Sequence, residues 1–484
     1  MSIYNIVWVS VILALFSSAS SLANEPQSPY YSACDDRGAS PKLADSDCIY
    51  IQTPLDHEAP EDQTIDLFVR KFPATRTHRG EIWLLAGGPG ESGASFYADI
   101  EFFRNVFADY DIIVPDHRGT GYSTKLCEPE ETRDSSDGLS LSGEEWGTCF
   151  GALYAATDRA HHFNQRNAAH DVDDLIKKLG SNKKTLIYAV SYGTSLALEY
   201  ANISTTNVDG IVLDSLTPSL SDALSGLSYR SHTTDRVGKA LLDRCANDPD
   251  CVLGPDAKAK YRTLLEAIDN GEAILGMDSV PNNDLRQFFG LLLDVPETRN
   301  RIPAIIDALS MRKPEATELI QKATSDYEAF WNPILSFEQA VFSIPLSGLI
   351  SGSEFNARRD LTIEELTREK AELDFASPLP GLLVNNQIPL YETPGEPLMR
   401  EQLPPLLVLQ GTFDPKTPYD AAMRRVATLK KHADVAVVSL LDAPHAAYFT
   451  GKDCLAEPLS RFAIEAASVE SHECSPEAAA ITFD

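Results

Sequence analysis

The sequence predicts an α/β fold, in which helices flank a mostly parallel, twisted sheet and a helical cap is inserted into that sheet. Three observations favour this fold. Short apolar runs that end in glycine turns alternate with helical patterns in the first part of the chain, as at 82–85. The same alternation returns at 406–409 and 435–438. Between the two zones, over about 223–401, helical patterns dominate and continuous strand runs are scarce.

The individual elements follow in chain order. Strand candidates in the first zone lie at 65–69, 82–85, 112–114, 185–190 and 211–213, with helical patterns over 167–179 and 194–200. Helical patterns in the insertion cover 258–270, 283–293, 302–309 and 362–373, and its end is rich in proline, as expected of a linker that returns to the core. We therefore expect a first core part at 24–222, a cap at 223–401 and a second core part at 402–484.

Composition and charge exclude several classes of protein. The 484 residues include 41 basic and 71 acidic side chains, a net charge of −30. Such a surface repels phosphate backbones and anionic lipids, so we expect no nucleic-acid partner and no membrane-surface partner. Hydrophobic residues make up 43% and charged residues 23%, which is typical of a globular chain rather than a disordered one.

The N-terminus has the features of a targeting segment. The apolar run at 6–16 is shorter than the roughly 20 residues that a membrane helix needs. Small polar residues follow, and Ser21-Leu22-Ala23 fits a signal-peptidase site. We expect a signal peptide at 1–23, cleaved before Asn24, and a secreted or periplasmic protein. An uncleaved anchor is the alternative.

Cysteine usage agrees with export. All eight cysteines lie beyond the apolar run and form four groups of two along the chain. An oxidising compartment and short loops favour four local disulfides. The expected pairs are Cys34–Cys48, Cys127–Cys149, Cys245–Cys251 and Cys454–Cys474. Reduced buried thiols are the alternative, and no tight zinc-binding spacing is present, so we expect neither a metal nor a cofactor.

The segment Ala189-Val190-Ser191-Tyr192-Gly193 is the strongest chemical signal. It lies where a buried strand pattern ends and a helical pattern begins, which is the setting of a nucleophile elbow. Small flanking residues allow the sharp turn that lifts the serine hydroxyl clear of the sheet. Ser191 is therefore the candidate nucleophile; the alternative is an ordinary turn with a helix-capping serine.

A glycine-rich turn at 87–90 follows the strand pattern at 82–85 and can present backbone N–H groups to a developing oxyanion. Pro89 has no N–H, so Gly88 is the better donor, together with the N–H of Tyr192. A phosphate-binding loop is the alternative, but neither a G-x-G-x-x-G nor a G-K-[ST] pattern is present. The later loop at 116–123 is predicted to brace the site, although His117 could be catalytic.

A serine nucleophile needs a base and an orienting acid. Asp414 and His445 each follow a late strand, in the order Ser, Asp, His that is typical of hydrolases with a nucleophile elbow. His445 alone among the histidines after Ser191 follows such a strand on a turn. Asp214, after the strand at 211–213, is the rival acid.

Together these motifs resemble the α/β-hydrolase fold, and more closely the proline iminopeptidase and tripeptidyl aminopeptidase family of serine exopeptidases, in its secreted branch. The matching segments are GGPGESG, DHRGTGYS, AVSYGTSLALEY, LDSLTP, LLVLQGTFDPKTP and APHAA. The resemblance implies a triad of Ser191, Asp414 and His445 and an oxyanion hole at Gly88 and Tyr192. Ala86 and Pro444 depart from the residues common in the family and leave the fit of the substrate open.

In that family, acidic side chains near the cap bind the free amino group of the substrate. The candidates here are Glu91, Glu338 and Glu354. The resemblance thus implies a secreted serine aminopeptidase, of prolyl or tripeptidyl type, whose partners are peptides with a free N-terminus. A carboxylesterase or lactone hydrolase with the same triad, and a non-catalytic binding protein on this scaffold, are the alternatives.

Overall fold

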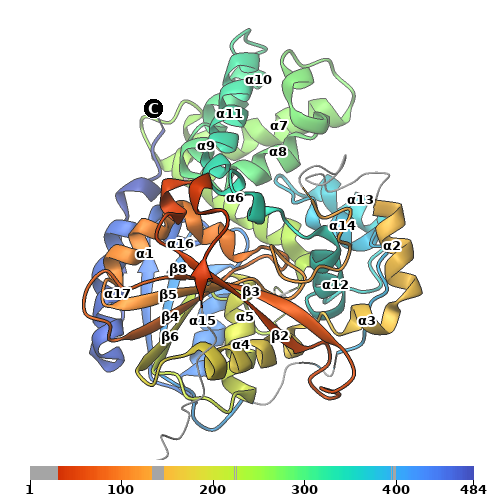
Figure 1. Ribbon diagram of the computed structural model, residues 1–484. Helices are drawn as coiled ribbons and strands as arrows, with labels where there is room; N and C mark the ends of the chain where they lie inside the picture. The colour runs from red at the N-terminus through yellow and green to blue at the C-terminus, as the bar shows by residue number, and fades with distance from the viewer. Residues whose placement is uncertain are drawn as a thin grey trace, which may run out of the picture.

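The computed structural model describes residues 31–132, 146–222, 224, 226–393, 395 and 399–483. The predicted signal peptide at 1–23 lies outside these residues. In the described part of the chain the strands form one ten-stranded sheet in the order β1-β2-β3-β5-β4-β6-β7-β8-β9-β10 (Figure 1). Their bounds are β1 Ser32–Ala33, β2 Asp47–Pro54, β3 Thr64–Phe72, β4 Gly80–Leu85, β5 Tyr110–Pro115, β6 Lys184–Val190, β7 Gly210–Asp214, β8 Leu406–Gly411, β9 Val435–Leu440 and β10 His472–Cys474.

The sheet is mostly parallel, as predicted. β1, β2, β3 and β5 pair antiparallel at one edge, and every pairing from β5 through β4 to β10 is parallel. The carboxyl ends of β4, β6, β8 and β9 therefore meet at one edge of the sheet, where sites collect in this class of fold.

Both faces of the sheet are buried at the central strands β4, β6, β7 and β8, which explains why these strands are continuous apolar runs rather than alternating ones. In β4, Trp83 and Leu85 point into the core beneath α4, α5 and α15, whereas Ile82 and Leu84 point into the core beneath α1 and α17. The helices outside the cap are α1 Ile100–Val106, α2 Trp146–Ala155, α3 Thr157–His161, α4 Gln165–Leu179, α5 Tyr192–Ile203, α15 Tyr419–Leu429, α16 Ala447–Thr450 and α17 Lys452–Ile464.

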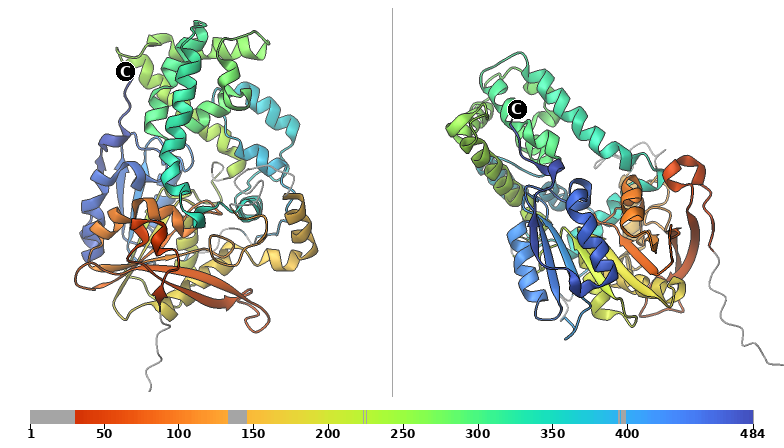
Figure 2. Two further views of the ribbon diagram at one scale, coloured as in Figure 1. Left: turned by 45° about the horizontal axis from the view of Figure 1, so that its top comes forward. Right: turned by 90° about the vertical axis from the view of Figure 1, so that its left-hand side faces the viewer.

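The cap lies between β7 and β8, within the stretch predicted to be helical. Its helices are α6 Arg230–Asn247, α7 Ala257–Asp269, α8 Leu285–Leu292, α9 Pro296–Asn300, α10 Ile302–Ser310, α11 Ala316–Leu335, α12 Ile344–Glu354, α13 Ile363–Glu372 and α14 Leu379–Val384. Helices α6, α7, α8, α10 and α11 share a hydrophobic core, whereas α12 packs into the core of the sheet. Figure 2 shows α11 running from the far end of the cap down to the sheet.

The structure contains four disulfides, and they join the pairs that the sequence analysis expected: Cys34–Cys48, Cys127–Cys149, Cys245–Cys251 and Cys454–Cys474. Among the described helices, none is by itself both long and apolar enough to cross a membrane; α11 and the segment Glu338–Glu354, bent by 117°, meet that length and composition only as a pair.

Candidate active site

Ser191 occupies a sharp turn between β6 and α5. Its backbone lies at φ 53° and ψ −121°, a strained region for a residue with a side chain, and its N–H donates to the carbonyl of Asp214 at 2.9 Å. Gly193 is required at this turn, since a Cβ there would lie 2.6 Å from the carbonyl oxygens of both Leu85 and Ala86. This geometry is that of the predicted nucleophile elbow.

Asp414 and His445 lie together at the ends of β8 and β9. Oδ2 of Asp414 is 2.8 Å from Nδ1 of His445. The other carboxylate oxygen, Oδ1, accepts hydrogen bonds from the backbone N–H groups of Lys416 (2.7 Å) and Thr417 (2.8 Å). Burial by itself raises the pKa of Asp414, but the charge of His445 and the hydrogen bonds from Thr417 outweigh it and lower that pKa. An ionised Asp414 can therefore orient the imidazole.

The rival acid, Asp214, has a different role. Its buried carboxylate accepts hydrogen bonds from the N–H groups of Ala447 (2.8 Å) and Tyr448 (3.1 Å) and from the hydroxyl of Tyr188 (2.7 Å). These contacts hold the backbone that follows His445. Asp214 thus anchors the histidine loop, while the ring of His445 is paired with Asp414.

One predicted oxyanion donor belongs to a turn beside Ser191, and the other directly follows Ser191 in the chain. A Cβ on Gly87 would lie 3.1 Å from Cβ of Ser191, so the turn that contains Gly88 passes directly beside the serine. Gly88 has φ 105°, a conformation that favours glycine. Tyr192 is the first residue of α5, and the N–H groups in the first turn of a helix have no partner within the helix.

Ser191 and His445 line one cavity of about 150 Å³. The side chains around it come from the core, from the end of α11 and from the short segment before α12, and they include Glu91, Lys416, Trp331, Phe342 and Phe449. Of the three acidic candidates for amine binding, only Glu91 lines this cavity.

The other two acidic candidates lie elsewhere. Glu338 is exposed to solvent. Glu354 accepts hydrogen bonds from the backbone N–H of Gln165 (3.0 Å) and from the hydroxyl of Tyr391, and burial raises its pKa to about 7. Neither Glu338 nor Glu354 therefore lines the cavity that contains Ser191.

Glu91 and Lys416 are the charged side chains that enter this cavity besides His445. Glu91 is exposed to solvent. The protein groups around it still raise the pKa of its carboxyl by desolvation, and the charges of Lys416 and His445 and a hydrogen bond from the backbone of Gly87 oppose that rise. Lys416 is already paired with the buried Asp294 at 3.0 Å. Within the described part of the chain, Glu91 has no salt-bridge partner.

Comparison with known proteins agrees with the observed fold. A family model described as the alpha/beta hydrolase fold matches residues 82–452, which is most of the chain. The chain belongs to the α/β hydrolase fold family.

Individual relatives are more distant. The chain is 26% identical over 260 residues to a protein of Escherichia coli K12 named "Putative hydrolase YuaR", covering 50% of this chain and 51% of that protein. It is also 26% identical over 245 residues to the serine protease Hip1 of Mycobacterium tuberculosis H37Rv, covering 46% of each. The chain thus spans about half the length of these curated relatives. A solved structure of VinJ aligns with 86% of this chain and 98% of that chain, at 15% identity and a TM-score of 0.41.

The loop after β5 of this α/β hydrolase is structural, as predicted. Arg118 is buried and donates to both carboxylate oxygens of Asp171, at 2.6 and 2.7 Å. Asp116 accepts hydrogen bonds from the N–H of Gly93 and from the side chain of Gln339 in the cap. Burial lowers the pKa of His117 to about 4, so at neutral pH its ring is uncharged; its Nε2 lies 3.1 Å from the hydroxyl of Tyr192.

Sequence reasoning missed the side chains that shape the cavity. Lys416 stands two residues after Asp414, in a segment quoted for its resemblance, so its position could have been inferred from that of the acid. Trp331 and Phe342 come from the cap, and no local pattern reveals that they reach Ser191. The described residues contain no group of three or more His, Cys, Asp or Glu side chains that could hold a metal ion.

Proposed function

We propose that this protein is a secreted serine aminopeptidase, of prolyl or tripeptidyl type, that cleaves peptides near a free N-terminus. The supporting observation is the position of Glu91: this acidic side chain, which forms no salt bridge with any residue that the structure describes, lines the same cavity as Ser191 and His445. A carboxylate that lines a cavity is a natural partner for the ammonium group of a substrate, because the two opposite charges attract each other there.

The reaction would proceed through an acyl-enzyme. The hydroxyl of Ser191 attacks the scissile carbonyl while Nε2 of His445 accepts its proton. The N–H groups of Gly88 and Tyr192 stabilise the negative charge on the carbonyl oxygen. His445 then donates the proton to the leaving amine, and Asp414 stabilises the positively charged imidazole. A water molecule, activated by His445 in the same way, releases the acyl group from Ser191.

The distances favour recognition of the amine on the residue whose carbonyl is attacked. A Cβ placed on Gly87 would lie 3.3 Å from Oε2 of Glu91 and 3.1 Å from Cβ of Ser191. These two atoms can therefore be no farther apart than the sum of the two distances. The amino nitrogen of an amino acid lies only roughly 2.5 Å from its own carbonyl carbon. A carboxylate this close to the nucleophile therefore suits the release of a single residue better than that of a tripeptide.

Two further observations support the proposal without deciding it. One relative, Hip1, is named a serine protease; the match covers 46% of its length. The four disulfides are compatible with an oxidising compartment, and thus with export after cleavage of the predicted signal peptide. Immunoblots of cell fractions, together with the N-terminal sequence of the mature protein, test export directly.

The experiment compares free and N-acetylated aminoacyl and tripeptidyl arylamides, with Ser191→Ala as the inactive control. We expect the free forms to be hydrolysed at a much higher kcat/KM than the acetylated forms, and single-residue release to be faster than release of a tripeptide. Equal turnover of free and acetylated forms would contradict an exopeptidase. Activity on esters alone would favour a carboxylesterase, and the absence of labelling of Ser191 by a fluorophosphonate would favour a non-catalytic binding protein.

A further inference from the structure

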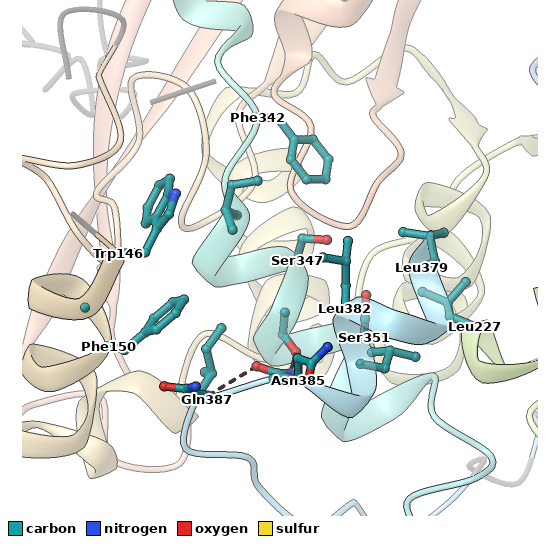
Figure 3. A pocket seen from close by; sticks show the side chains of 16 residues that line it. Trp146, Phe150, Leu227, Phe342, Ser347, Ser351, Leu379, Leu382, Asn385 and Gln387 are labelled. Carbon is teal, nitrogen blue, oxygen red and sulfur yellow. Dashed lines mark hydrogen bonds between the residues drawn. The ribbon is translucent and has the colours of Figure 1, made fainter. Parts of the chain in front are cut away.

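A second, larger cavity lies next to the candidate active site. Its volume is about 580 Å³, against about 150 Å³ for the cavity that contains Ser191. Figure 3 shows Trp146 and Phe150 of α2 on one side of this chamber and Leu379 and Leu382 of α14 on the other. The chamber is thus formed between the cap and the segment that precedes α4.

The lining of the chamber selects against charged ligands. None of the described residues around it is charged, although charged residues make up 23% of the chain. Leucine, isoleucine and aromatic side chains dominate, and the polar groups are serine hydroxyls and side-chain amides. A phosphate, carboxylate or ammonium group would lose its hydration there without gaining a partner, whereas an apolar group would gain contacts.

One side chain, Phe342, lines both cavities. It lies in the short segment before α12, and its ring is partly exposed. The ring lies close to the turn beside Ser191: a Cβ on Gly90 would be 3.4 Å from Cζ of Phe342 and 3.2 Å from Cβ of Ser347, which also lines the chamber. The chamber therefore adjoins the turn that faces the carbonyl group under attack.

The walls of the chamber are fixed on two sides by one short turn, Cys127–Glu131. Cys127 forms a disulfide with Cys149, which lies in α2 between Trp146 and Phe150. Glu131 accepts a hydrogen bond from the N–H of Cys127 (2.7 Å) and another from the hydroxyl of Ser343, the residue after Phe342. The chamber is thus preformed rather than created by the ligand. Binding to a preformed site costs less free energy, because fewer side chains and loops have to be ordered.

We propose that this chamber binds an apolar acyl group of the substrate, and that Phe342 sets how large an acyl group the enzyme accepts. The inference rests on Ser191 being the nucleophile, as in the proposed function, but not on recognition of a free amine. The acyl group held at Ser191 extends past Phe342 into the chamber, while the leaving group departs on the side of His445. Apolar peptidyl groups and medium-length fatty acyl groups share this chemistry.

The test measures kcat/KM for p-nitrophenyl acetate, which is too short to pass Phe342, and for p-nitrophenyl decanoate. Phe342→Ala should raise the decanoate-to-acetate ratio about tenfold, and Phe342→Trp should lower it. Leu382→Asp, which places a charge in the chamber, should lower the ratio about tenfold. The matched control is Leu291→Asp: Leu291 is 36% exposed against 37% for Leu382 and does not line the chamber, so the ratio should stay within about twofold of the wild type.

A parallel series uses arylamides with free N-termini, comparing alanyl with phenylalanyl and apolar tripeptidyl groups. If the variants change the ratio of kcat/KM in the arylamide series alone, the occupant is a peptidyl group; if they change it in the ester series alone, the occupant is a fatty acyl group. Either result supports acyl binding in the chamber. Unchanged ratios in both series for the Phe342 and Leu382 variants would overturn it. Because esters need no free amine, failure to cleave arylamides contradicts the proposed aminopeptidase and leaves the test of the chamber intact.

Discussion

Oε2 of Glu91 and Cβ of Ser191 lie 3.3 and 3.1 Å from the position that a Cβ on Gly87 would take. A side chain at Gly87 would therefore come between the acid and the predicted nucleophile. The closeness also has an electrostatic consequence. An ionised Glu91 opposes the negative charge that develops on the carbonyl oxygen, unless a cation such as a substrate ammonium neutralises it.

Glu91→Gln tests this relationship. Loss of the charge should lower kcat/KM for free aminoacyl arylamides by roughly 30-fold, which corresponds to about 2 kcal/mol for a charged hydrogen bond. For acetylated substrates, kcat/KM should rise or stay unchanged. Glu338→Gln is the control, since Glu338 is exposed like Glu91 but does not line the cavity. Equal losses for free and acetylated substrates would contradict amine recognition by Glu91.

The same residue predicts a pH dependence. Desolvation by the groups around it raises the pKa of Glu91, although the residue is exposed to solvent, so its charged form appears only as the pH rises through a value above the ordinary one for glutamate. The preference for free over acetylated substrates should accordingly fall as the pH is lowered through that range. Ratios of kcat/KM measured from pH 4 to pH 8 check this, and the Glu91→Gln variant should show a flat ratio.

Substitution of Asp414 and of Asp214 by Asn should have different effects. Asp414→Asn should lower kcat by about 10⁴ while the protein stays folded, because the imidazole loses its orienting charge. Asp214→Asn should mainly destabilise the protein, by about 1–3 kcal/mol, because the hydrogen bonds to Ala447, Tyr448 and Tyr188 are disrupted. Single-turnover kinetics and thermal unfolding separate the two effects; a larger loss of activity in the Asp214 variant at full folding would reverse the assignment.

Gly193→Ala should be strongly destabilising, since the added Cβ would lie 2.6 Å from two backbone carbonyl oxygens. Gly151→Ala is a matched change in α2, where the added Cβ meets no atom within 4 Å. We expect that change to stabilise the protein by about 0.5–1 kcal/mol. Chemical denaturation gives the free energy of unfolding of both variants. A Gly193→Ala variant as stable as the wild type would contradict the tight elbow described above.

Glu131 should make stability depend on pH. Burial raises its pKa from 4.5 to about 7 in the folded protein, against the hydrogen bonds from Ser343 and Cys127. The folded state therefore holds a proton that the unfolded state releases, so this contribution is fully present below pH 4.5 and is lost as the pH rises to about 7. The loss amounts to at most about 3 kcal/mol. Glu131→Gln should flatten the change in unfolding free energy between pH 5 and pH 8; an unchanged slope would contradict it.

The parts of the site that the sequence predicts are those fixed by local rules. A nucleophile elbow needs small residues next to Ser191, and Asp414 and His445 each follow a recognisable strand, so their convergence follows from a parallel sheet. The β2 strand and the fit of the cap do not follow from such rules. Phe342 and Trp331 reach the site only through the packing of α11 and α12, which no periodicity records, and Glu91 could not be told apart from Glu338 and Glu354 without coordinates.

The strands β7 and β8 are hydrogen-bonded neighbours, yet the whole cap is inserted between them. Both ends of the insertion therefore leave and enter the scaffold at almost the same place, with the register of the sheet set without it. Exchange of the part of the cap that shares a hydrophobic core should change which compounds are accepted and leave the reacting groups where they are. Helix α12, which packs into the core of the sheet, has to stay with the scaffold.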